Sequence, residues 1–428
     1  MTLDQRLLDQ VDQQLARTDE LLSQRYPGDD GRRQAVHTVY TPADQFTPDV
    51  VARWGQQALE AVQQQGSMID VVTQVLDQRA DDAQYVERLA DLVERKLTNE
   101  PIEDLRIDFE DGYGRRSDAE EDQHAIQAAK GVAQSLRDGI APPFIGIRFK
   151  CMESDVRARG LRTLDLYLST LVDEIGSLPE STVLTLPKVT TVDQVKAMND
   201  VVSALESGLG LDERQLRYEV QVETPQLIVG AEGQAEVSRV IHAGEGRITS
   251  LHYGTYDYSA SLGIAAAYQA MDHPAADFAK NVMLTAVAGT GVHLSDGSTN
   301  ILPLGNPQEV REAWGLHARL VARHLRRGIY QGWDLHAAQL PTRFIATFDF
   351  FNRSLDSAVD RLGRYVRVES GSIMDEPATA KALARYIVRS TSCGAANPAE
   401  IQQRLGISED VLLTLAATGL TPQMSANN

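Results

Sequence analysis

Short runs of β-branched and other apolar residues alternate along this chain with longer segments in which apolar residues recur every three or four positions. The short runs predict strands, and the longer segments, such as residues 118–138, predict amphipathic helices. Eight predicted strands lie at 36–42, 105–111, 144–150, 182–188, 218–223, 247–254, 291–296 and 332–339. Eight strands that alternate with helices predict an α/β protein built on a TIM (β/α)8 barrel.

The two ends of the chain lack this alternation. Residues 1–26 have an amphipathic helical pattern that ends at PGDDG, and the segment from Pro341 onward contains helical patterns without strands. We therefore predict three parts: an N-terminal helical extension (1–35), the (β/α)8 barrel (36–340) and a helical C-terminal extension (341–428). The segment 67–100 is longer than a barrel connection requires, and its role is not predicted.

The composition limits the possible partners and compartment. The chain has 428 residues and a formal net charge of −19, and so acidic a protein repels the phosphate backbone of nucleic acids. No run approaches the roughly 18 apolar residues of a membrane span, and the first residues lack the order of a signal peptide. The two cysteines, Cys151 and Cys393, fit a reducing compartment. We predict a cytoplasmic protein that binds neither nucleic acid nor membranes.

Polar side chains gather where the predicted strands end. Both faces of a parallel barrel strand are buried, so its polar residues are expected at the carboxyl end, where barrel active sites lie. The candidates are Glu110, Asp111, Arg148, Lys188, Glu223, Asp257, His336 and Gln339. A structural protein does not need this convergence, whereas an enzyme that binds an anionic carbonyl substrate with a divalent cation does.

Glu223 and Asp257 are the candidate metal ligands. They are 34 positions apart (257 − 223) and follow consecutive predicted strands, so they should be neighbours at the barrel mouth. Two carboxylates, together with waters and an oxo acid, suit octahedral Mg²⁺ or Mn²⁺. Such a cation stabilises the enolate that forms when a carbon–carbon bond next to a carbonyl breaks or forms.

Candidate substrate contacts surround this pair. Arg148 can hold a carboxylate through two parallel hydrogen bonds. Gly254 allows backbone N–H groups to approach a substrate closely, and Thr255 and His336 are further candidate contacts.

Each candidate also has a purely structural interpretation, and the sequence leaves these alternatives open. They are a solvated strand end for Glu223, a helix N-cap for Asp257, an ion pair with Asp108 for Arg148, a solvated turn for Glu110 and Asp111, an ion pair for Lys188, and a structural hydrogen bond for His336. The chain contains no P-loop, no HExxH, no GxSxG and no Cys/His cluster, so it lacks the motifs of several other enzyme classes.

Seven motifs, taken in order, resemble one protein family. They are IDFEDGYGRR, IGIRFK, LPKV, VQVETPQLIVGA, LHYGTYDYSASLGI, DLHAAQ and GSIMDEPATAKAL. Together they resemble the citrate lyase β-subunit-like branch of the HpcH/HpaI aldolase superfamily, over residues 36–390. Members of that branch are Mg²⁺-dependent TIM-barrel carbon–carbon lyases and ligases that act on oxo acids or acyl-CoA thioesters.

The resemblance implies roles for individual residues. It makes Glu223 and Asp257 the metal ligands, and Arg148 the arginine that binds the substrate carboxylate. It makes Glu110 and Asp111 the acidic pair that moves protons beside the metal. The expected activity is a Mg²⁺-dependent carbon–carbon lyase or aldolase that acts on an oxo acid or an acyl-CoA thioester. The alternatives are a malate-synthase-like condensing enzyme, an acyl-CoA thioesterase, and a non-catalytic binding or subunit protein.

Some motifs depart from the family pattern. Arg115 and Arg116 stand where relatives usually carry a lysine, and DLHAAQ replaces the usual His-Pro-x-Gln, so the use of CoA is implied less strongly than the metal site. In relatives the segment that corresponds to residues from Gly371 onward commonly crosses to a neighbouring subunit. Its apolar stripe therefore predicts either a contact in a homo-oligomer or packing on the chain's own core; the stripe consists of Ala380, Leu383, Ala384 and Ile387.

Overall fold

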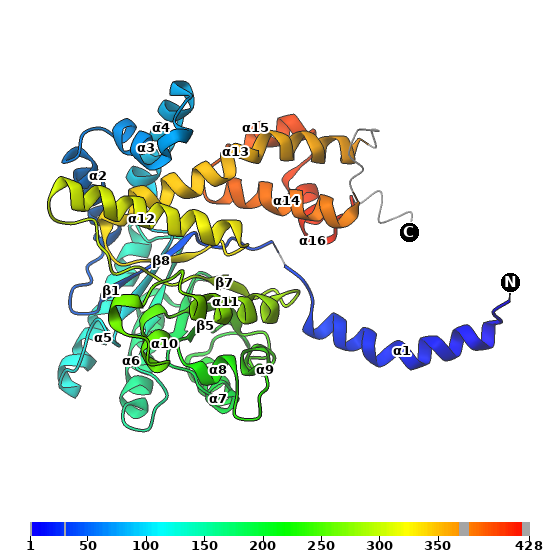
Figure 1. Cartoon of the computed structure of the whole chain (residues 1–428). Helices are drawn as coiled ribbons and strands as arrows, with labels where there is room; N and C mark the ends of the chain where they lie inside the picture. The colour runs from blue at the N-terminus through cyan, green and yellow to red at the C-terminus, as the bar shows by residue number, and fades with distance from the viewer. Residues whose placement is uncertain (1, 30, 368–375, 422–428) are drawn as a thin grey trace.

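Eight parallel strands form a barrel in the computed structural model, which describes residues 2–29, 31–367 and 376–421 (Figure 1). The strands are β1 (His37–Pro42), β2 (Asp104–Asp108), β3 (Phe144–Arg148), β4 (Val183–Leu186), β5 (Arg217–Val222), β6 (Ile248–Tyr253), β7 (His293–Ser295) and β8 (Gly332–Asp334). They pair in the order β7-β6-β5-β4-β3-β2-β1-β8, and a parallel bridge between Ser295 and Gln331 joins the two edges. The predicted (β/α)8 barrel is confirmed, and each predicted strand overlaps an observed one.

Helices surround the barrel and follow its strands. They are α2 (Val50–Gln63), α3 (Met68–Leu76), α4 (Ala83–Asn99), α5 (Asp118–Arg137), α6 (Arg157–Ile175), α7 (Val192–Leu209), α8 (Pro225–Ile228), α9 (Glu236–Ala243), α10 (Thr255–Ser261), α11 (Pro274–Val287), α12 (Pro307–Arg326) and α13 (Leu340–Val366). The long segment between β1 and β2 is helical, since α2, the 3-10 turn η1 (Asp77–Arg79) and helices α3 and α4 occupy it. No described helix has the length and apolarity that crossing a membrane requires.

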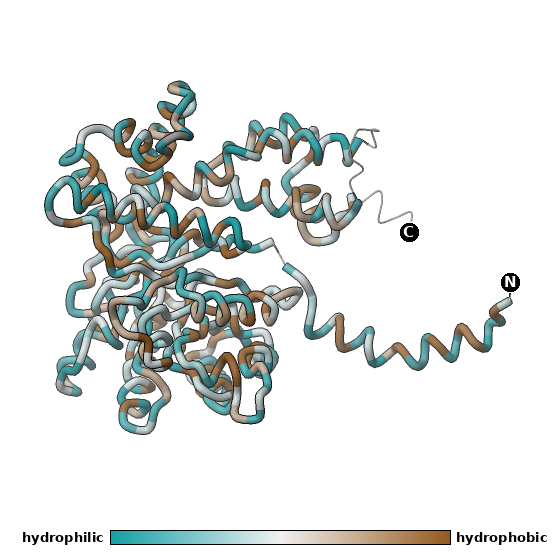
Figure 2. Tube along the Cα trace, viewed as in Figure 1, coloured by the Kyte–Doolittle hydropathy of each residue, from teal (hydrophilic) through white to brown (hydrophobic). Residues whose placement is uncertain are grey.

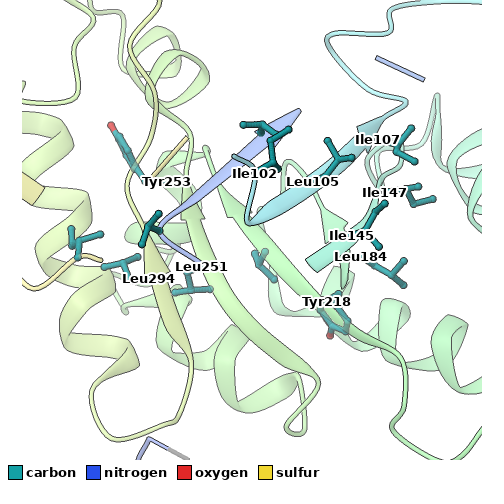
Figure 3. Packing of buried hydrophobic residues seen from close by; sticks show 14 of the residues in the cluster. Ile102, Leu105, Ile107, Ile145, Ile147, Leu184, Tyr218, Leu251, Tyr253 and Leu294 are labelled. Carbon is teal, nitrogen blue, oxygen red and sulfur yellow. The ribbon is translucent and has the colours of Figure 1, made fainter. Parts of the chain in front are cut away.

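The strands alternate between an apolar outer face and a charged inner face. In β2, Leu105 and Ile107 pack in the hydrophobic core together with Ile147 of β3 (Figure 3). Between them lies Arg106, which donates to Glu219 of β5 across the barrel interior at 2.9 Å. We expected polar residues to gather at the carboxyl ends of the strands. Charged residues also occupy strand interiors because Arg106 and Glu219 neutralise each other there.

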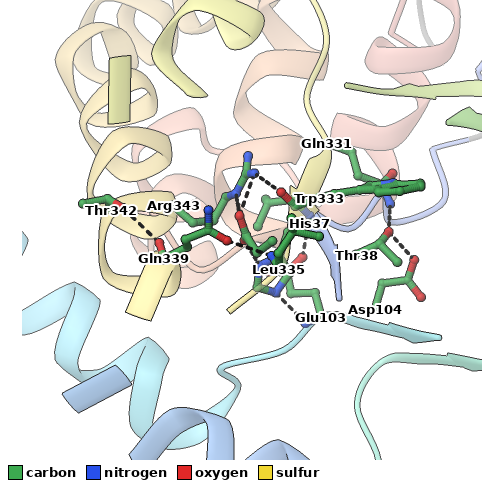
Figure 4. A network of polar contacts seen from close by, with 12 residues as sticks. His37, Thr38, Glu103, Asp104, Gln331, Trp333, Leu335, Gln339, Thr342 and Arg343 are labelled. Carbon is green, nitrogen blue, oxygen red and sulfur yellow. Dashed lines mark hydrogen bonds and ion pairs between the residues drawn. The ribbon is translucent and has the colours of Figure 1, made fainter. Parts of the chain in front are cut away.

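A second buried polar network joins β8 to the helices behind it (Figure 4). Asp334 of β8 accepts from Arg343 of α13 and lies 2.7 Å from His37 of β1 and 3.0 Å from His317 of α12. Arg343 also lies 2.9 Å from His324, and burial together with the Arg343 charge lowers the pKa of His324 to about 3. Burial alone would raise the pKa of Asp334, but Arg343 and the two histidines hold it well below its usual value.

The C-terminal helices share α13 with the barrel. The first half of α13, including Phe344 and Phe348, packs in the barrel core, whereas Leu355 and Leu362 in its second half belong to a separate core. The second core is completed by α14 (Pro377–Ser392), α15 (Pro398–Leu405) and α16 (Glu409–Thr418). Helix α13 begins at Leu340 and its first half belongs to the barrel core, so the division at 340/341 stays a prediction.

The apolar stripe of α14 lies inside the chain. Ala380, Ala384 and Ile387 are fully buried in the second core, so this stripe is not available to a partner. The interpretation that it contacts a neighbouring subunit is therefore wrong, and own-core packing is the alternative that holds. Residues 371–375 of the same motif lie outside the described residues.

Helix α1 (Gln5–Arg25) differs from the other long helices because none of its residues is buried. It extends away from the barrel on the side where the C-terminal helices also project (Figure 1). The predicted N-terminal helix is thus present, and its apolar residues face solvent.

Candidate active site

Glu223 lies directly after β5, inside the barrel mouth. It is only 2% exposed, and its Oε1 accepts a hydrogen bond from the backbone N–H of Lys188 at 2.8 Å. The interpretation as a solvated strand end is therefore excluded. Burial and the charges of Asp257 and Glu110 raise the pKa of Glu223 to about 8. A buried carboxyl with a pKa near neutrality and other carboxylates beside it is typical of a functional site.

Asp257 approaches this carboxyl from the neighbouring β6 side. It lies exposed in the first turn of α10, and the N-cap position of that helix is Gly254, so Asp257 is not the N-cap. Its charge acts on Glu223, which supports the predicted proximity of the two carboxylates. Gly254 explains how they fit together, because a Cβ there would lie 2.6 Å from Cβ and 2.9 Å from Oε2 of Glu223. The space left by the missing side chain is used by Glu223.

Lys188 contacts the acidic pair after β2, Glu110 and Asp111, at the same barrel mouth. Its Nζ donates to Oε1 of Glu110 at 2.7 Å and to Oδ1 of Asp111 at 2.8 Å. Lys188 has a φ of +51°, a left-handed conformation that is uncommon for lysine and is often found at functional sites. The sequence suggested a structural ion pair for this residue. The pair exists, and its partners are the two predicted acid–base residues.

Glu110 and Asp111 have opposite pKa shifts. Burial raises the pKa of Glu110, and the Asp111 charge adds to that effect, although Arg148 opposes it. Burial also acts to raise the pKa of Asp111, but hydrogen bonds from Lys188 and Glu110 outweigh it, so that pKa is lowered. Near neutral pH the two carboxyls therefore differ in proton affinity, as acid–base pairs commonly do.

Asp108, at the end of β2, accepts hydrogen bonds from several residues at the barrel mouth. Asp108 is not among the candidate functional residues that the sequence predicts. It accepts from Nε and Nη2 of Arg148, both at 2.7 Å, and from the backbone N–H groups of Glu110 and Gly112 at 2.9 and 2.8 Å. The ion pair with Asp108 that we listed as an alternative for Arg148 is present. Nη1 of Arg148 remains directed at the mouth, 3.6 Å from Oε2 of Glu110.

Two residues in the barrel interior, Tyr40 and Gln221, also contact the guanidinium of Arg148. Its guanidinium lies 4.6 Å from the centre of the Tyr40 ring. With the Gln221 amide oriented to satisfy both neighbours, its oxygen accepts from Nη1 of Arg148 and its nitrogen donates to Oε1 of Glu223, each at 3.3 Å. Gln221 thereby links the predicted substrate arginine to the predicted metal ligand. Gln221 precedes Glu223 by two residues, and residues at that spacing in a strand point to the same face. This spacing could have identified Gln221 from the sequence.

The remaining candidates, Thr255, His336 and Arg116, differ in burial and in their hydrogen-bond partners. Thr255 is buried, and its Oγ1 has no hydrogen-bond partner within the described residues. His336 is half-buried and accepts from the backbone N–H of Ala338 at 3.1 Å, so its Nδ1 has a structural partner. Arg116 is exposed and pairs with Asp44 at 3.0 Å.

A cavity of about 110 Å³ opens at the opposite, amino end of the barrel. Its buried charges are already paired, since Arg106 contacts Glu219 at 2.9 Å and Arg33 contacts Glu103 at 3.1 Å. This cavity lies away from Glu223 and Asp257. The carboxyl end holds the charges that are incompletely compensated, which makes it the better candidate site.

The charge balance at the mouth fits a divalent cation. The charges of Asp257 and Glu110 act on Glu223, and hard carboxylate oxygens are the ligands that Mg²⁺ prefers. A cation between Glu223 and Asp257 would offset the repulsion that raises the Glu223 pKa. Within the described part of the chain, no three His, Cys, Asp or Glu side chains are already grouped as a metal cluster.

Solved structures share this architecture. A citrate lyase from Burkholderia xenovorans LB400 aligns with a TM-score of 0.57 and 16% identity, over 88% of this chain and 97% of that chain. Lower TM-scores are found for Haloferax volcanii malate synthase (0.47, 13% identity, 90% and 98% covered) and for the citrate lyase β subunit of Mycobacterium tuberculosis (0.42, 15% identity, 74% and 99% covered). No curated protein matches the chain.

The barrel has the same fold as the B. xenovorans citrate lyase, which agrees with the predicted (β/α)8 architecture. Within that fold, the family described as a domain of unknown function, DUF6986, matches residues 15–419. The chain belongs to this family. At 16% identity the likeness to the citrate lyase concerns the fold, so the activity has to be argued from the site itself.

Proposed function

We propose that this protein is a Mg²⁺-dependent carbon–carbon lyase that acts on a small oxo acid or on an acyl-CoA thioester. One observation carries the proposal: the buried Glu223 carboxyl lies against the charges of Asp257 and Glu110 at the carboxyl end of the barrel, which raises its pKa. Carboxylates that surround a buried carboxyl at that end of a barrel do not favour stability, and a bound cation would offset their repulsion.

Glu223 and Asp257 would hold the cation, which can be Mg²⁺ or Mn²⁺. Water and substrate oxygens would complete the coordination sphere, as is usual for Mg²⁺ sites with few protein ligands. The bound cation supplies Lewis-acid stabilisation of the negative charge that develops on the substrate carbonyl oxygen.

Substrate orientation is assigned to the residues around this pair. Arg148 would bind the substrate carboxylate through Nη1, while Asp108 and Tyr40 hold the guanidinium in place. The unpartnered Oγ1 of Thr255 and the backbone at Gly254 would contact the substrate on the β6 side, and His336 on the β8 side.

Proton transfer is assigned to the acidic pair after β2. The pKa of Glu110 is raised, so Glu110 binds a proton more readily than Asp111 does and is the proposed proton acceptor and donor. Asp111 has a lowered pKa, remains ionised and keeps Lys188 in position. Lys188 in turn fixes the orientation of the Glu110 carboxyl through its 2.7 Å contact.

Removal of the metal, combined with a substrate panel, tests the proposal. The panel should contain oxaloacetate, glyoxylate, pyruvate and acetoacetate with CoA or acetyl-CoA, because structures of the H. volcanii and M. tuberculosis proteins contain compounds of this group. We expect carbon–carbon cleavage with Mg²⁺, loss of turnover with EDTA and recovery with Mg²⁺ or Mn²⁺. Turnover that EDTA leaves unchanged would contradict the proposal.

The products distinguish the alternatives on the same site. Formation of a carbon–carbon bond from glyoxylate and acetyl-CoA would indicate a malate-synthase-like condensing enzyme, and release of free CoA alone would indicate a thioesterase. Binding of Mg²⁺ and oxo acids without turnover of any compound would favour a non-catalytic binding or subunit protein. We further propose that the protein acts as a homo-oligomer in the cytoplasm, where its two buried free cysteines would stay reduced.

A further inference from the structure

We propose that α1 (Gln5–Arg25) is an assembly element that packs in parallel against α1 of a second copy of this chain. The inference is independent of the proposed chemistry, because α1 lies outside the barrel and contributes nothing to the candidate site (Figure 1).

The exposure of α1 is the first observation. Its large apolar side chains are between 38% and 49% exposed; they are Leu7, Leu8, Val11, Leu15, Leu21 and Leu22. The hydropathy colouring shows apolar and polar positions alternating along the helix (Figure 2). Most helical stability in proteins comes from packing of an amphipathic face, so the exposed apolar stripe of α1 calls for a surface that covers it.

The spacing of the stripe indicates what that surface is. Leu8, Val11, Leu15, Thr18 and Leu22 are separated by three, four, three and four residues. This is the a/d spacing of a coiled coil, in which each side chain inserts between four side chains of a facing helix. Leu7 and Leu21 widen the stripe along one edge. A helix is therefore the expected partner, and a lipid surface is not.

The charged residues on α1 also argue against a membrane. The helix carries four carboxylates (Asp9, Asp12, Asp19, Glu20) and three guanidiniums (Arg6, Arg17, Arg25). Helices that lie on anionic membranes have polar faces rich in lysine and arginine. A polar face with a carboxylate excess would be repelled from such a surface.

The positions of the charges set the direction of the pair. In the heptad with Leu8 and Leu15 at position a, Asp12 and Asp19 lie at e on one edge of the stripe, and the opposite g edge carries the uncharged residues Leu7, Gln14 and Leu21. In a parallel pair the acidic edge of each helix faces this uncharged edge of its partner. In an antiparallel pair the two acidic edges would face each other.

The area is sufficient for a specific contact. The helix is roughly 31 Å long, from 21 residues at 1.5 Å each. Two facing stripes of half-exposed leucines and valines would hide on the order of 1,000 Å² in total, the size at which specific interfaces begin.

The molar mass of the full chain in light scattering tests the interface. We expect the wild-type protein at micromolar concentration to have at least twice the mass of one chain. The double variant Leu15→Glu/Leu22→Glu should reduce that mass, because charged side chains would then occupy the seam, while glutamate preserves helix propensity. A matched control, Gln13→Glu/Gln24→Glu, adds the same charge on the polar face and should leave the mass unchanged.

Two outcomes of this experiment would overturn the inference. One is a wild-type protein with the mass of a single chain. The other is an assembly whose mass is the same in the wild type and in Leu15→Glu/Leu22→Glu, since the interface would then lie elsewhere. Because α1 has no buried residue, all variants should keep the wild-type melting temperature, which separates loss of assembly from loss of folding.

Disulfide trapping tests the direction. In a parallel pair the two Leu8→Cys residues face each other, and mild oxidation should link the chains. In an antiparallel pair they would be roughly 20 Å apart, too far for a disulfide, and only Leu8→Cys/Leu22→Cys would cross-link. Cross-linking of the double variant alone would refute the parallel arrangement. The native Cys151 and Cys393 are buried and should not interfere.

Discussion

Two regions of this molecule bury charged side chains in different ways. At the β1–β8 junction, Asp334 is surrounded by Arg343, His37 and His317, and each of these contacts is a hydrogen bond or an ion pair. At the barrel mouth, by contrast, Glu223 lies beside Asp257 and Glu110, and its pKa is raised. Burial acts to raise the pKa of both carboxyls. At Glu223 the charges of Asp257 and Glu110 add to this effect, whereas at Asp334 the Arg343 charge and the hydrogen bonds from the two histidines outweigh it.

If the proposed function is right, the difference separates a stabilising network from a functional one. A buried carboxylate that is fully paired helps to hold the structure together, and loss of one partner is costly. A buried carboxylate beside other carboxylates destabilises the metal-free protein and persists because a bound cation or substrate makes use of it. Substitutions in the two regions should therefore have opposite consequences for stability and for binding.

The largest expected effect is the loss of activity in Glu223→Gln. Removal of a metal ligand should lower kcat/KM by about 1,000-fold. It should also abolish Mg²⁺ binding, as measured by calorimetry. Stability should change in the opposite direction. The stabilisation from a carboxyl whose pKa is raised to about 8 is complete below 4.5 and is lost as pH rises through 8.

In EDTA at pH 8 the melting temperature of Glu223→Gln should therefore equal or exceed that of the wild type. The difference should vanish as the pH approaches 4.5. A variant that is less stable than the wild type at pH 8 would show that Glu223 belongs to the stabilising kind of network.

Asp334→Asn should show the reverse pattern. The variant leaves the buried Arg343 without its counter-charge and should lower the free energy of unfolding by about 3–5 kcal/mol, as measured by urea denaturation. Mg²⁺ affinity of the folded protein should stay at the wild-type value. The control is Asp272→Asn, which breaks a half-exposed pair with Arg319 and should cost less than about 1 kcal/mol.

Arg148→Lys tests whether one guanidinium at the barrel mouth both pairs with Asp108 and binds the substrate. Lysine cannot hold Asp108 with two nitrogens and still present a third to a substrate, so KM for the oxo acid should rise about 10- to 100-fold. The Mg²⁺ affinity should change less than KM does. Equal oxo-acid binding in the variant and the wild type would remove Arg148 from the substrate site.

Gly254→Ala should have the smallest effect. Its backbone φ of −97° suits alanine, but the added Cβ would lie 2.6 Å from Cβ of Glu223 and displace that side chain. We expect about 10-fold weaker Mg²⁺ binding, together with a lower melting temperature, because a contact with Cβ requires the backbone to shift as well. Gly208→Ala, where nothing lies within 4 Å, is the control and should leave Mg²⁺ binding unchanged.

The barrel could be predicted because its signals are local. Period-2 runs such as that around Glu219 mark strands wherever they occur, and eight of them fix the topology. The proximity of Glu223 and Asp257 could be predicted, because the two residues follow consecutive strands, whereas their role as metal ligands stays a prediction. The contact of Lys188 with Glu110 was not predicted, because 78 positions separate the two residues and only the folded chain brings them together. The pair of Asp108 and Arg148, 40 positions apart, was one of two alternatives that the sequence left open.

The exposed stripe of α1 and the buried stripe of α14 show the limit of such reasoning. Both helices have apolar residues at helical spacing, and the resemblance to relatives favoured α14 as the partner-facing one. In the structure Ala380 and Ile387 of α14 are fully buried, whereas Leu15 and Leu22 of α1 are almost half exposed. Periodicity identifies an apolar face, but only tertiary packing decides whether the chain itself covers it.

The 27-residue helix α13 has a consequence for how this protein unfolds. Its first half is part of the barrel core and its second half is part of the C-terminal core, without an intervening loop. Disruption of either core would expose half of a helix that the other core still requires. The two cores are therefore expected to melt as one cooperative unit, although only one of them carries the candidate site.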